Sequence, residues 1–176
     1  MRGQHYLGTM EHPLTIRPAL PEDALDLLRW RNDPLVRAMS RTSEPIPEAS
    51  HLAWYTAACQ DPNRLLLVGA VDGAAVGMVR FDRRPPTDWE ANIMLAPEAR
   101  GVGLAKDLLA AGLDRLEASH RVAVVLAAIR HSNTSSIRLF ESLGFRLTDA
   151  DREFRYFRLR CATEQDHGGN SATDDD

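Results

Sequence analysis

The sequence has few cysteines and no long apolar run. Its two cysteines, Cys59 and Cys161, lie far apart and belong to no CxxC or cysteine–histidine pattern. We therefore expect neither a disulfide framework nor a metal site. No stretch approaches the roughly 18 apolar residues of a membrane span, and residues 1–13 lack the apolar core of a secretory signal. We expect a cytoplasmic protein with reduced cysteines that does not bind a membrane.

Positive charge is also in short supply. The formal net charge is −4 and the isoelectric point is near 5.9, whereas nucleic-acid-binding domains normally carry a basic surplus. Nucleic acid is therefore not an expected partner. Among the 21 basic residues, only Lys106 is a lysine. The arginine excess fits both genome composition and bidentate binding of phosphate.

At 176 residues the chain has the size of one domain. We expect the folded domain over residues 14–160. Residues 1–13 are expected to form a flexible extension, and residues 161–176 a disordered acidic tail. The sequence leaves the oligomeric state open between a monomer and a homodimer.

Hydrophobic periodicity predicts alternating strands and helices. Asp72-Gly73, a strong hairpin signal, separates two apolar runs that we interpret as antiparallel strands. Leucines at spacings of 3 to 4 after residue 103 predict a helix with one buried face. In chain order, we expect a strand over 14–19, helices over 21–33 and 47–61, strands over 64–71, 74–84 and 88–96, a helix after 103, a strand over 122–129, a helix over 133–144, and strands over 145–149 and 154–160. This order is typical of an α/β domain with a central mixed sheet and helices on its faces.

Small residues alternate where the leucine-patterned helix begins. Gly101, Gly103 and Ala105 leave the backbone bare there, although glycine at a helix start costs backbone entropy and packing. A helix N-terminus has up to four unpaired N–H groups and a partial positive charge, so bare backbone lets an anionic group reach several amides. The pattern indicates a phosphate cradle. Close seating of the helix on a sheet is the alternative use of these glycines.

Two motifs in this order resemble a known family. RGVGLA, residues 100–105, resembles the R/Q-x-x-G-x-G/A signature of the GNAT superfamily of acetyl-coenzyme A dependent N-acetyltransferases. NTSSIRLFESLGF, residues 133–145, resembles the family's N-x-x-S-x-x-L-Y/F-E-x-x-G-F segment at the usual distance downstream. The resemblance covers about residues 14–160. It implies the GNAT fold, with a mostly antiparallel mixed sheet, and acetyl-coenzyme A as cosubstrate without a metal.

The resemblance also implies which residues bind the cosubstrate. Backbone amides of the first motif would hold the coenzyme A diphosphate, and the end of the preceding strand would pair with the pantetheine arm. Asn133 and Ser136 resemble positions near the pantetheine and adenosine, although Asn133 equally suits a helix cap. The implied binding residues are Met94, Leu95, Arg100, Gly101, Val102, Gly103, Leu104, Ala105, Asn133 and Ser136.

The chemistry of acetyl transfer needs a base for the amine and favours an acid for the leaving sulfur. Glu90 stands where many related enzymes carry a strand glutamate, so the resemblance implies that it accepts the amine proton, directly or through a water. An arginine partner or a solvent-facing residue is the alternative. The family's acid, a tyrosine, is replaced by Phe140. A thiol of pKa near 8.5 is a tolerable leaving group without that acid. Water, or the hydroxyl of Tyr156 or Ser136, is a candidate to replace it.

The acceptor should bind the N-terminal third of the chain. Residues 28–40 and 50–54 are similar to a subgroup containing ribosomal-protein N-terminal acetyltransferases and amino-sugar acetyltransferases of pseudaminic-acid pathways. Spacing at helical intervals equally fits core aromatics and ion-paired arginines. The candidates are Arg29, Arg31 and Arg37 for a nucleotide diphosphate, Trp30 or Trp54 for stacking on a sugar or base, and His51 as a hydrogen-bond donor.

We therefore expect an enzyme that transfers an acetyl group from acetyl-coenzyme A to a primary amine of a small molecule. A nucleotide-linked amino sugar is the leading acceptor. The alternatives are a protein N-terminal acetyltransferase and a non-catalytic acyl-coenzyme A sensor, the latter suggested by Phe140 and the acidic tail.

Overall fold

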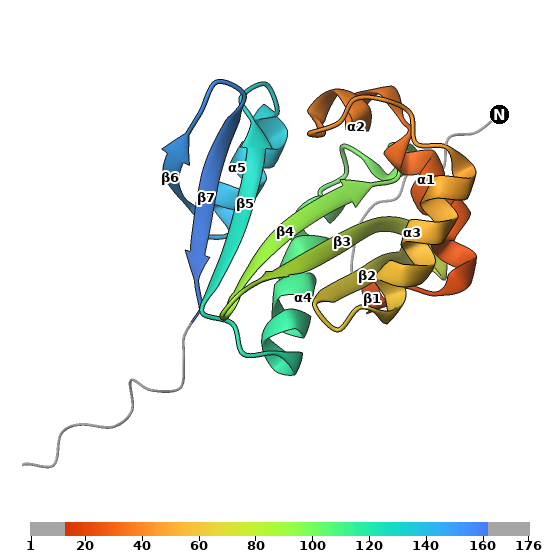
Figure 1. The fold of residues 1–176 in the computed structure, drawn as a ribbon, viewed down its shortest axis with the longest axis horizontal. Helices are drawn as coiled ribbons and strands as arrows, with labels where there is room; N and C mark the ends of the chain where they lie inside the picture. Colours follow the sequence, from red (N-terminus) through yellow and green to blue (C-terminus); the bar gives the residue numbers. More distant parts are fainter. Residues whose placement is uncertain (1–12, 162–176) are drawn as a thin grey trace, which may run out of the picture.

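The computed structural model describes residues 13–161, which fold around one seven-stranded sheet (Figure 1). The strands are β1 (Thr15–Pro18), β2 (Arg64–Val71), β3 (Ala74–Arg84), β4 (Asp88–Leu95), β5 (Val124–Arg130), β6 (Arg146–Ala150) and β7 (Phe154–Arg160). The α-helices are α1 (Ala24–Arg31), α2 (Pro34–Met39), α3 (Glu48–Gln60), α4 (Leu104–Ser119) and α5 (Thr134–Ser142), with short 3₁₀ turns at Pro21–Asp23 and Pro97–Ala99. The sheet order is β1-β2-β3-β4-β5-β7-β6. The expected α/β fold with a mixed, mostly antiparallel sheet is confirmed, since only β4 and β5 pair in parallel.

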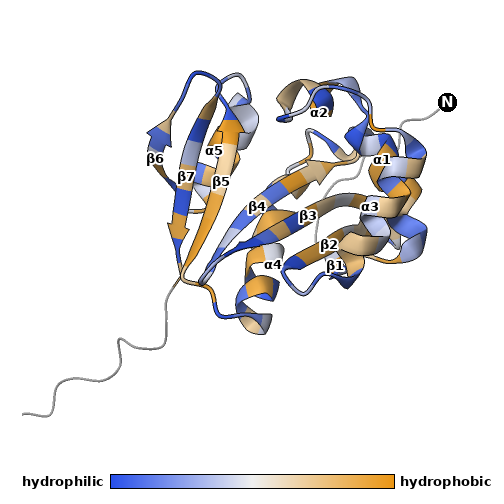
Figure 2. Ribbon diagram, viewed as in Figure 1, coloured by the Kyte–Doolittle hydropathy of each residue, from blue (hydrophilic) through white to orange (hydrophobic). Residues whose placement is uncertain are grey.

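Alternation along the central strands gives the sheet two buried faces. On β3, Val79 and Phe81 belong to the core beneath α4, whereas Val76 and Met78 belong to the core beneath α1 and α3. Successive strand residues point to opposite faces, so a strand that is apolar at most positions must be covered on both sides. In Figure 2, β5 is hydrophobic along most of its length, whereas β3 and β4 carry both hydrophobic and hydrophilic residues.

The parallel pair in the centre of the sheet is very short. β4 and β5 are joined only at Asp88 with Val124, Trp89 with Val125 and Glu90 with Leu126. Beyond these pairs β4 stays paired with β3 as far as Leu95, and β5 stays paired with β7. The two halves of the sheet therefore separate past Glu90, as Figure 1 shows. The crossover helix α4 begins close to the end of β4.

One helix differs from the expected pattern. The predicted helix over residues 21–33 is divided into the 3₁₀ turn and α1, and α2 follows it. Pro34 cannot donate to α1 because it has no N–H, but proline suits the first position of a new helix. Asp33 caps α2 by accepting hydrogen bonds from the N–H groups of Leu35 and Val36 at 3.1 and 3.3 Å. Six residues without a buried side chain gave no periodic signal for α2.

The expected extension and tail, residues 1–13 and 161–176, lie outside the described residues except for their innermost positions. Within residues 13–161, no helix has the length and apolarity needed to cross a bilayer. Among these described residues, no three histidine, cysteine, aspartate or glutamate side chains lie together so that they could hold a metal ion. Cys59 and Cys161 are both free thiols.

Candidate active site

A cavity of about 800 Å³ opens where β4 and β5 separate. Its walls include residues 90–95 of β4 and 127–129 of β5, together with side chains from α1, α2, α3 and α5. The edge of β4 that faces β5 has no strand partner past Glu90 within the described chain. Main-chain N–H and C=O groups at such an edge are available to an extended ligand.

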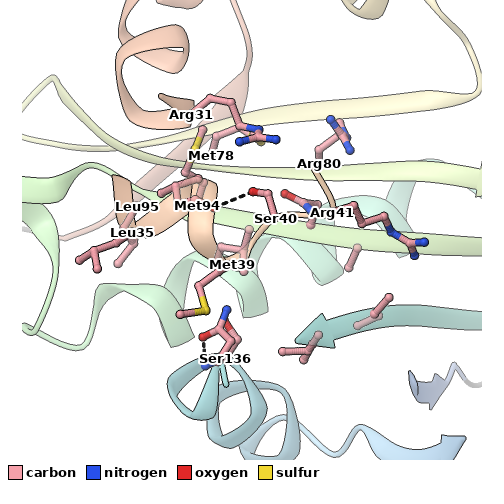
Figure 3. A pocket seen from close by; sticks show the side chains of 18 of the residues that line it. Arg31, Leu35, Met39, Ser40, Arg41, Met78, Arg80, Met94, Leu95 and Ser136 are labelled. Carbon is pink, nitrogen blue, oxygen red and sulfur yellow. Dashed lines mark hydrogen bonds between the residues drawn. The ribbon is translucent and has the colours of Figure 1, made fainter. Parts of the chain in front are cut away.

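A bridging segment, residues 39–42, spans from the helical side of this cavity to the far half of the sheet. The carbonyl of Ser40 accepts a hydrogen bond from Arg130 Nε at 2.9 Å, and Ser132 Oγ lies 3.7 Å from the sulfur of Met39. The Arg41 guanidinium carbon lies 5.4 Å from the ring centroid of Phe154. In Figure 3, Met39, Ser40 and Arg41 lie between Arg31 on one side of the cavity and Ser136 on the other. The segment therefore closes one side of the cavity.

The turn between β4 and α4 presents bare backbone. Gly101 and Gly103 have φ values of 80° and 87°, a left-handed conformation that favours glycine, and a Cβ at either position would meet nothing within 4 Å. No backbone N–H of residues 101–105 donates a hydrogen bond within the described chain. Arg100 leaves the turn to bind Asp33 Oδ1 at 2.9 Å. Free amides in open space at a helix N-terminus suit the diphosphate expected here.

The residues expected to bind the cosubstrate fall into two groups. Val102, Gly103 and Leu104 do not line the cavity, and the Leu104 side chain is buried in the core. The Asn133 side chain caps α5, because its Oδ1 accepts a hydrogen bond from the N–H of Ser136 at 3.2 Å. The prediction that Asn133 is a helix cap is therefore confirmed. The expected residues that line the cavity are Met94, Leu95, Arg100, Gly101, Ala105, Asn133 and Ser136.

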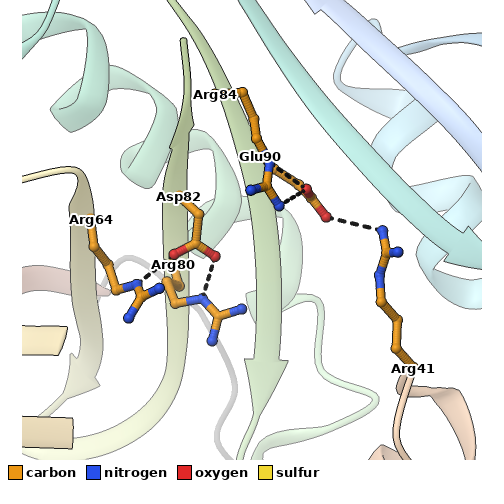
Figure 4. A network of polar contacts seen from close by, with 6 residues as sticks. All are labelled: Arg41, Arg64, Arg80, Asp82, Arg84 and Glu90. Carbon is orange, nitrogen blue, oxygen red and sulfur yellow. Dashed lines mark hydrogen bonds and ion pairs between the residues drawn. The ribbon is translucent and has the colours of Figure 1, made fainter. Parts of the chain in front are cut away.

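Glu90 lies on the cavity wall and is held by two arginines (Figure 4). Arg41 Nη2 lies 3.3 Å from one carboxylate oxygen, and Arg84 Nε lies 3.0 Å from the other. The Glu90 side chain keeps 23% of its surface exposed, so water reaches it. Glu90 is therefore an arginine partner, as in the alternative interpretation of the sequence, and it also faces the cavity, as a base for the amine must.

Among the acceptor candidates, Trp54 and His51 line the cavity. Trp54 has the guanidinium groups of Arg64 and Arg80 each 5.6 Å from its ring centroid, so arginines already occupy its aromatic surface. His51 Nε2 lies 2.8 Å from the carbonyl oxygen of Ala24. Because a carbonyl only accepts, Nε2 carries the hydrogen, and neutral His51 offers the cavity an acceptor at Nδ1 rather than the expected donor. Burial lowers the pKa of His51, which favours this neutral form, although the bond to Ala24 opposes the shift.

The expectation that Trp30 contacts the acceptor is wrong. Its side chain is fully buried in the core between α1, α3 and the sheet, and it does not line the cavity. Arg31, the next residue on α1, does line the cavity. Arg29 and Arg37 lie outside it, where Arg29 pairs with Glu98 and Arg37 Nε donates to the carbonyl of Ser43.

The structure separates the two hydroxyl groups proposed to replace the missing acid. Phe140 is buried at the cavity border and packs edge-on against Phe145, with ring centroids 4.9 Å apart. Ser136 lines the cavity. Its hydroxyl makes no hydrogen bond within the described chain. The hydroxyl of Tyr156 instead donates to Asp151 at 2.6 Å, and Tyr156 lies outside the cavity.

Three arginines of the site were not anticipated from the sequence. Arg41 and Arg80 line the cavity, and Arg84 binds Glu90. Arg80 follows Met78 on the same face of β3, so strand alternation after a buried methionine could have placed it. Arg41 lies in a segment without periodicity, and its partner is 49 residues away, so no local signal was present.

This chain is similar in sequence and in structure to known acetyltransferases. The L-methionine sulfoximine/L-methionine sulfone acetyltransferase of Pseudomonas paraeruginosa is 29% identical over 140 residues, which cover 76% of this chain and 81% of that protein. Acetyltransferase PseH of Campylobacter jejuni is 23% identical over 136 residues, covering 76% and 83% of the two chains. The structure of yncA from Salmonella typhimurium, solved with its cofactor acetyl-CoA, superposes with a TM-score of 0.74 at 25% identity, over 92% of this chain and 99% of that one. Residues 13–146 match the family described as the acetyltransferase (GNAT) domain. Because this match spans most of the chain and agrees with the fold, the protein belongs to the GNAT acetyltransferases.

Proposed function

We propose that this acetyltransferase moves the acetyl group of acetyl-coenzyme A to the primary amine of a small molecule bound in the cavity beside the bridging segment. The closure of one side of this cavity by residues 39–42 is the observation that carries this proposal. A pocket of about 800 Å³ is in the range that encloses small ligands. A protein N-terminus would need an open groove, whereas residues 39–42 close this side through Arg130 and Ser132.

Two features of the chain fit acetyl-coenzyme A. The free amides of residues 101–105 suit its diphosphate, since charge-assisted hydrogen bonds from several donors together support micromolar affinity. The unpaired edge of β4 at Met94 and Leu95 suits the amide-bearing pantetheine arm. The glycines leave room for the diphosphate, because no atom of the described chain lies within 4 Å of a Cβ at Gly101 or Gly103.

In the proposed reaction the neutral amine attacks the thioester carbonyl, a C–N bond forms and the C–S bond breaks. Glu90 accepts the amine proton through a water, because Arg41 and Arg84 already occupy its two oxygens and a quarter-exposed side chain admits solvent. His51 Nδ1 is a second acceptor for the ammonium group in the same cavity. In this proposal Ser136, which lines the cavity, protonates the departing sulfur in place of a tyrosine.

Two kinds of acceptor are considered. One is the amino-acid derivative in the name of the Pseudomonas paraeruginosa protein, L-methionine sulfoximine or L-methionine sulfone. The other is the nucleotide-linked amino sugar expected from the sequence resemblance. The occupied aromatic surface of Trp54 favours the first, because a nucleotide base would have to displace Arg64 or Arg80 to stack there.

The test is release of free thiol from acetyl-coenzyme A with a panel of amines. The panel contains L-methionine sulfone, L-methionine sulfoximine, other apolar L-amino acids, a nucleotide-linked amino sugar and a peptide with a free N-terminus. We expect acceleration by at least one small amine and none by the peptide. Acceleration by the peptide alone would establish the N-terminal acetyltransferase instead. Binding of acetyl-coenzyme A without acceleration by any amine would establish a sensor.

A further inference from the structure

One arginine of the cavity has no anionic partner among residues 13–161. Arg31, at the end of α1, donates from Nη2 to the carbonyl of Thr42 at 3.1 Å. Its Nη1 is buried and has no hydrogen-bond partner within the described chain. Arg31 also forms no ion pair with an acid of residues 13–161, whereas Arg41, Arg80 and Arg100 in the same cavity each bind a carboxylate. A guanidinium stays protonated at any relevant pH, so a buried donor without a partner destabilises the free protein.

The surroundings of Arg31 strengthen its positive potential. Burial lowers the pKa of Arg31 and the charges of Arg80 and Arg37 lower it further, as expected for a cation beside other cations. Arg80 lines the cavity beside Arg31 (Figure 3), and its Nε donates to Asp82 Oδ2 at 2.9 Å. Asp82 is itself shared with Arg64. This part of the cavity therefore holds more cationic than anionic groups, in a protein whose net charge is −4.

The rest of the cavity limits what the anion belongs to. Leu27, Ile46 and Met78 give the same cavity an apolar lining. Glu90 and His51 Nδ1 supply acceptors for an ammonium or amine. Donors for an anion, acceptors for an amine and an apolar wall together match a small amino acid with an apolar side chain.

We propose that Arg31 Nη1, supported by Arg80, binds a carboxylate of the acceptor, so that amino acids and their derivatives are the substrate class of this enzyme. This inference rests on the proposed function and adds its specificity determinant. A planar guanidinium matches the geometry of a carboxylate and forms charge-assisted hydrogen bonds to it. The phosphates of a nucleotide-linked sugar would meet the same charge, but the base would lack a free aromatic surface at Trp54.

The experiment compares each amino acid of the panel with its own carboxamide, in the wild type, Arg31→Gln and Arg31→Lys. The two acceptors share the amine and the side chain and differ in the negative charge. For the wild type we expect a kcat/KM about 10- to 100-fold higher for the acid, the ratio of one charge-assisted hydrogen bond. The amine of the carboxamide loses its proton more easily than the amine of the acid, so without a carboxylate site the carboxamide would be the more reactive acceptor. Arg31→Gln should remove the preference by raising KM for the acid, and Arg31→Lys should keep part of it.

Arg115→Gln is the control for a lost positive charge, because Arg115 is exposed on α4 outside the cavity. It should keep the wild-type ratio. Equal use of acid and carboxamide by the wild type, survival of the preference in Arg31→Gln, or acetylation of the nucleotide-linked amino sugar alone would each overturn the inference. If no amine is acetylated, the proposed function fails. The carboxylate site is then judged by thermal unfolding, where L-methionine sulfone must stabilise the wild type and not Arg31→Gln.

Discussion

Arg41 Nη2 lies 3.3 Å from Glu90 Oε1, and this ion pair fastens the bridging segment to the strand that carries the proposed base. Arg41 also lies over Phe154 of β7. Arg41 therefore joins the bridging segment to β4 and to β7. A substitution of Glu90 changes the charge of the cavity wall and also releases a contact that holds the bridging segment over the cavity.

Glu90→Gln should lower kcat by about 10²- to 10⁴-fold, the usual contribution of a general base, with a smaller effect on KM for acetyl-coenzyme A. Steady-state rates of thiol release over a range of pH measure this effect. Arg41→Gln is the matched variant, since it breaks the same ion pair and leaves the Glu90 carboxylate in place. Equal losses in the two variants would make Glu90 a positioning residue rather than the base.

Gly103→Ala should weaken acetyl-coenzyme A binding by more than it weakens the fold. Its φ of 87° makes any side chain unfavourable by about 1 kcal/mol, and the added methyl group would occupy part of the open space in which we expect the diphosphate. Gly73→Ala is the control, because Gly73 also has a positive φ of 77° and open space around a Cβ. Chemical unfolding should show similar losses of stability for both variants. Calorimetric titration should show reduced affinity for acetyl-coenzyme A only in Gly103→Ala, and unchanged affinity there would contradict the phosphate cradle.

Ser136→Ala should lower kcat when sulfur departure limits the rate, because its hydroxyl lines the cavity. Tyr156→Phe should have no such effect, since the Tyr156 hydroxyl already donates to Asp151 outside the cavity. A solvent isotope effect on thiol release should fall in Ser136→Ala alone. The opposite ranking of the two variants would identify Tyr156 of β7 as the acid.

The stability of the protein should depend on His51 below about pH 6.5, the ordinary pKa of histidine. Burial lowers the pKa of His51 in the folded state, so the unfolded chain binds a proton first as the pH falls. The free energy of unfolding should therefore be highest above about pH 6.5 and should decrease below it. The decrease should be about 1.4 kcal/mol for each unit by which the pKa of His51 is lower in the folded than in the unfolded chain.

Urea unfolding of the wild type and His51→Gln at about pH 8 and about pH 5 measures this dependence. The glutamine amide can still donate to the Ala24 carbonyl but does not titrate, so the pH dependence should be weaker in His51→Gln. An equal pH dependence in both proteins would assign it to other groups.

Much of the fold could be predicted because it is encoded locally. The alternation of Met78, Val79 and Phe81 indicates a strand covered on two faces, and the leucines of α4 repeat at helical spacing. The glycine turn was predictable for the same reason, since helix start and small residues are adjacent in the chain. The short helix α2 was not, because it buries no side chain and depends on Asp33 and Pro34 for its start.

The acceptor side could be predicted only in part. Leu27 and Trp30 are three residues apart on one buried face of α1, which is why Trp30 is in the core while Arg31 beside it reaches the cavity. The contacts of Arg41 with Glu90 and of Arg130 with Ser40 join residues 49 and 90 positions apart. Such pairs arise from tertiary packing and leave no trace in local sequence patterns.

The three residue pairs between β4 and β5 have a mechanical consequence. Each half of the sheet keeps a complete antiparallel ladder of its own, β1 to β4 on one side and β5 to β7 on the other. A change in the angle between the two halves would therefore break few backbone hydrogen bonds. The cavity between the halves can be reshaped in evolution for a different amine while each half keeps its own strand pairing.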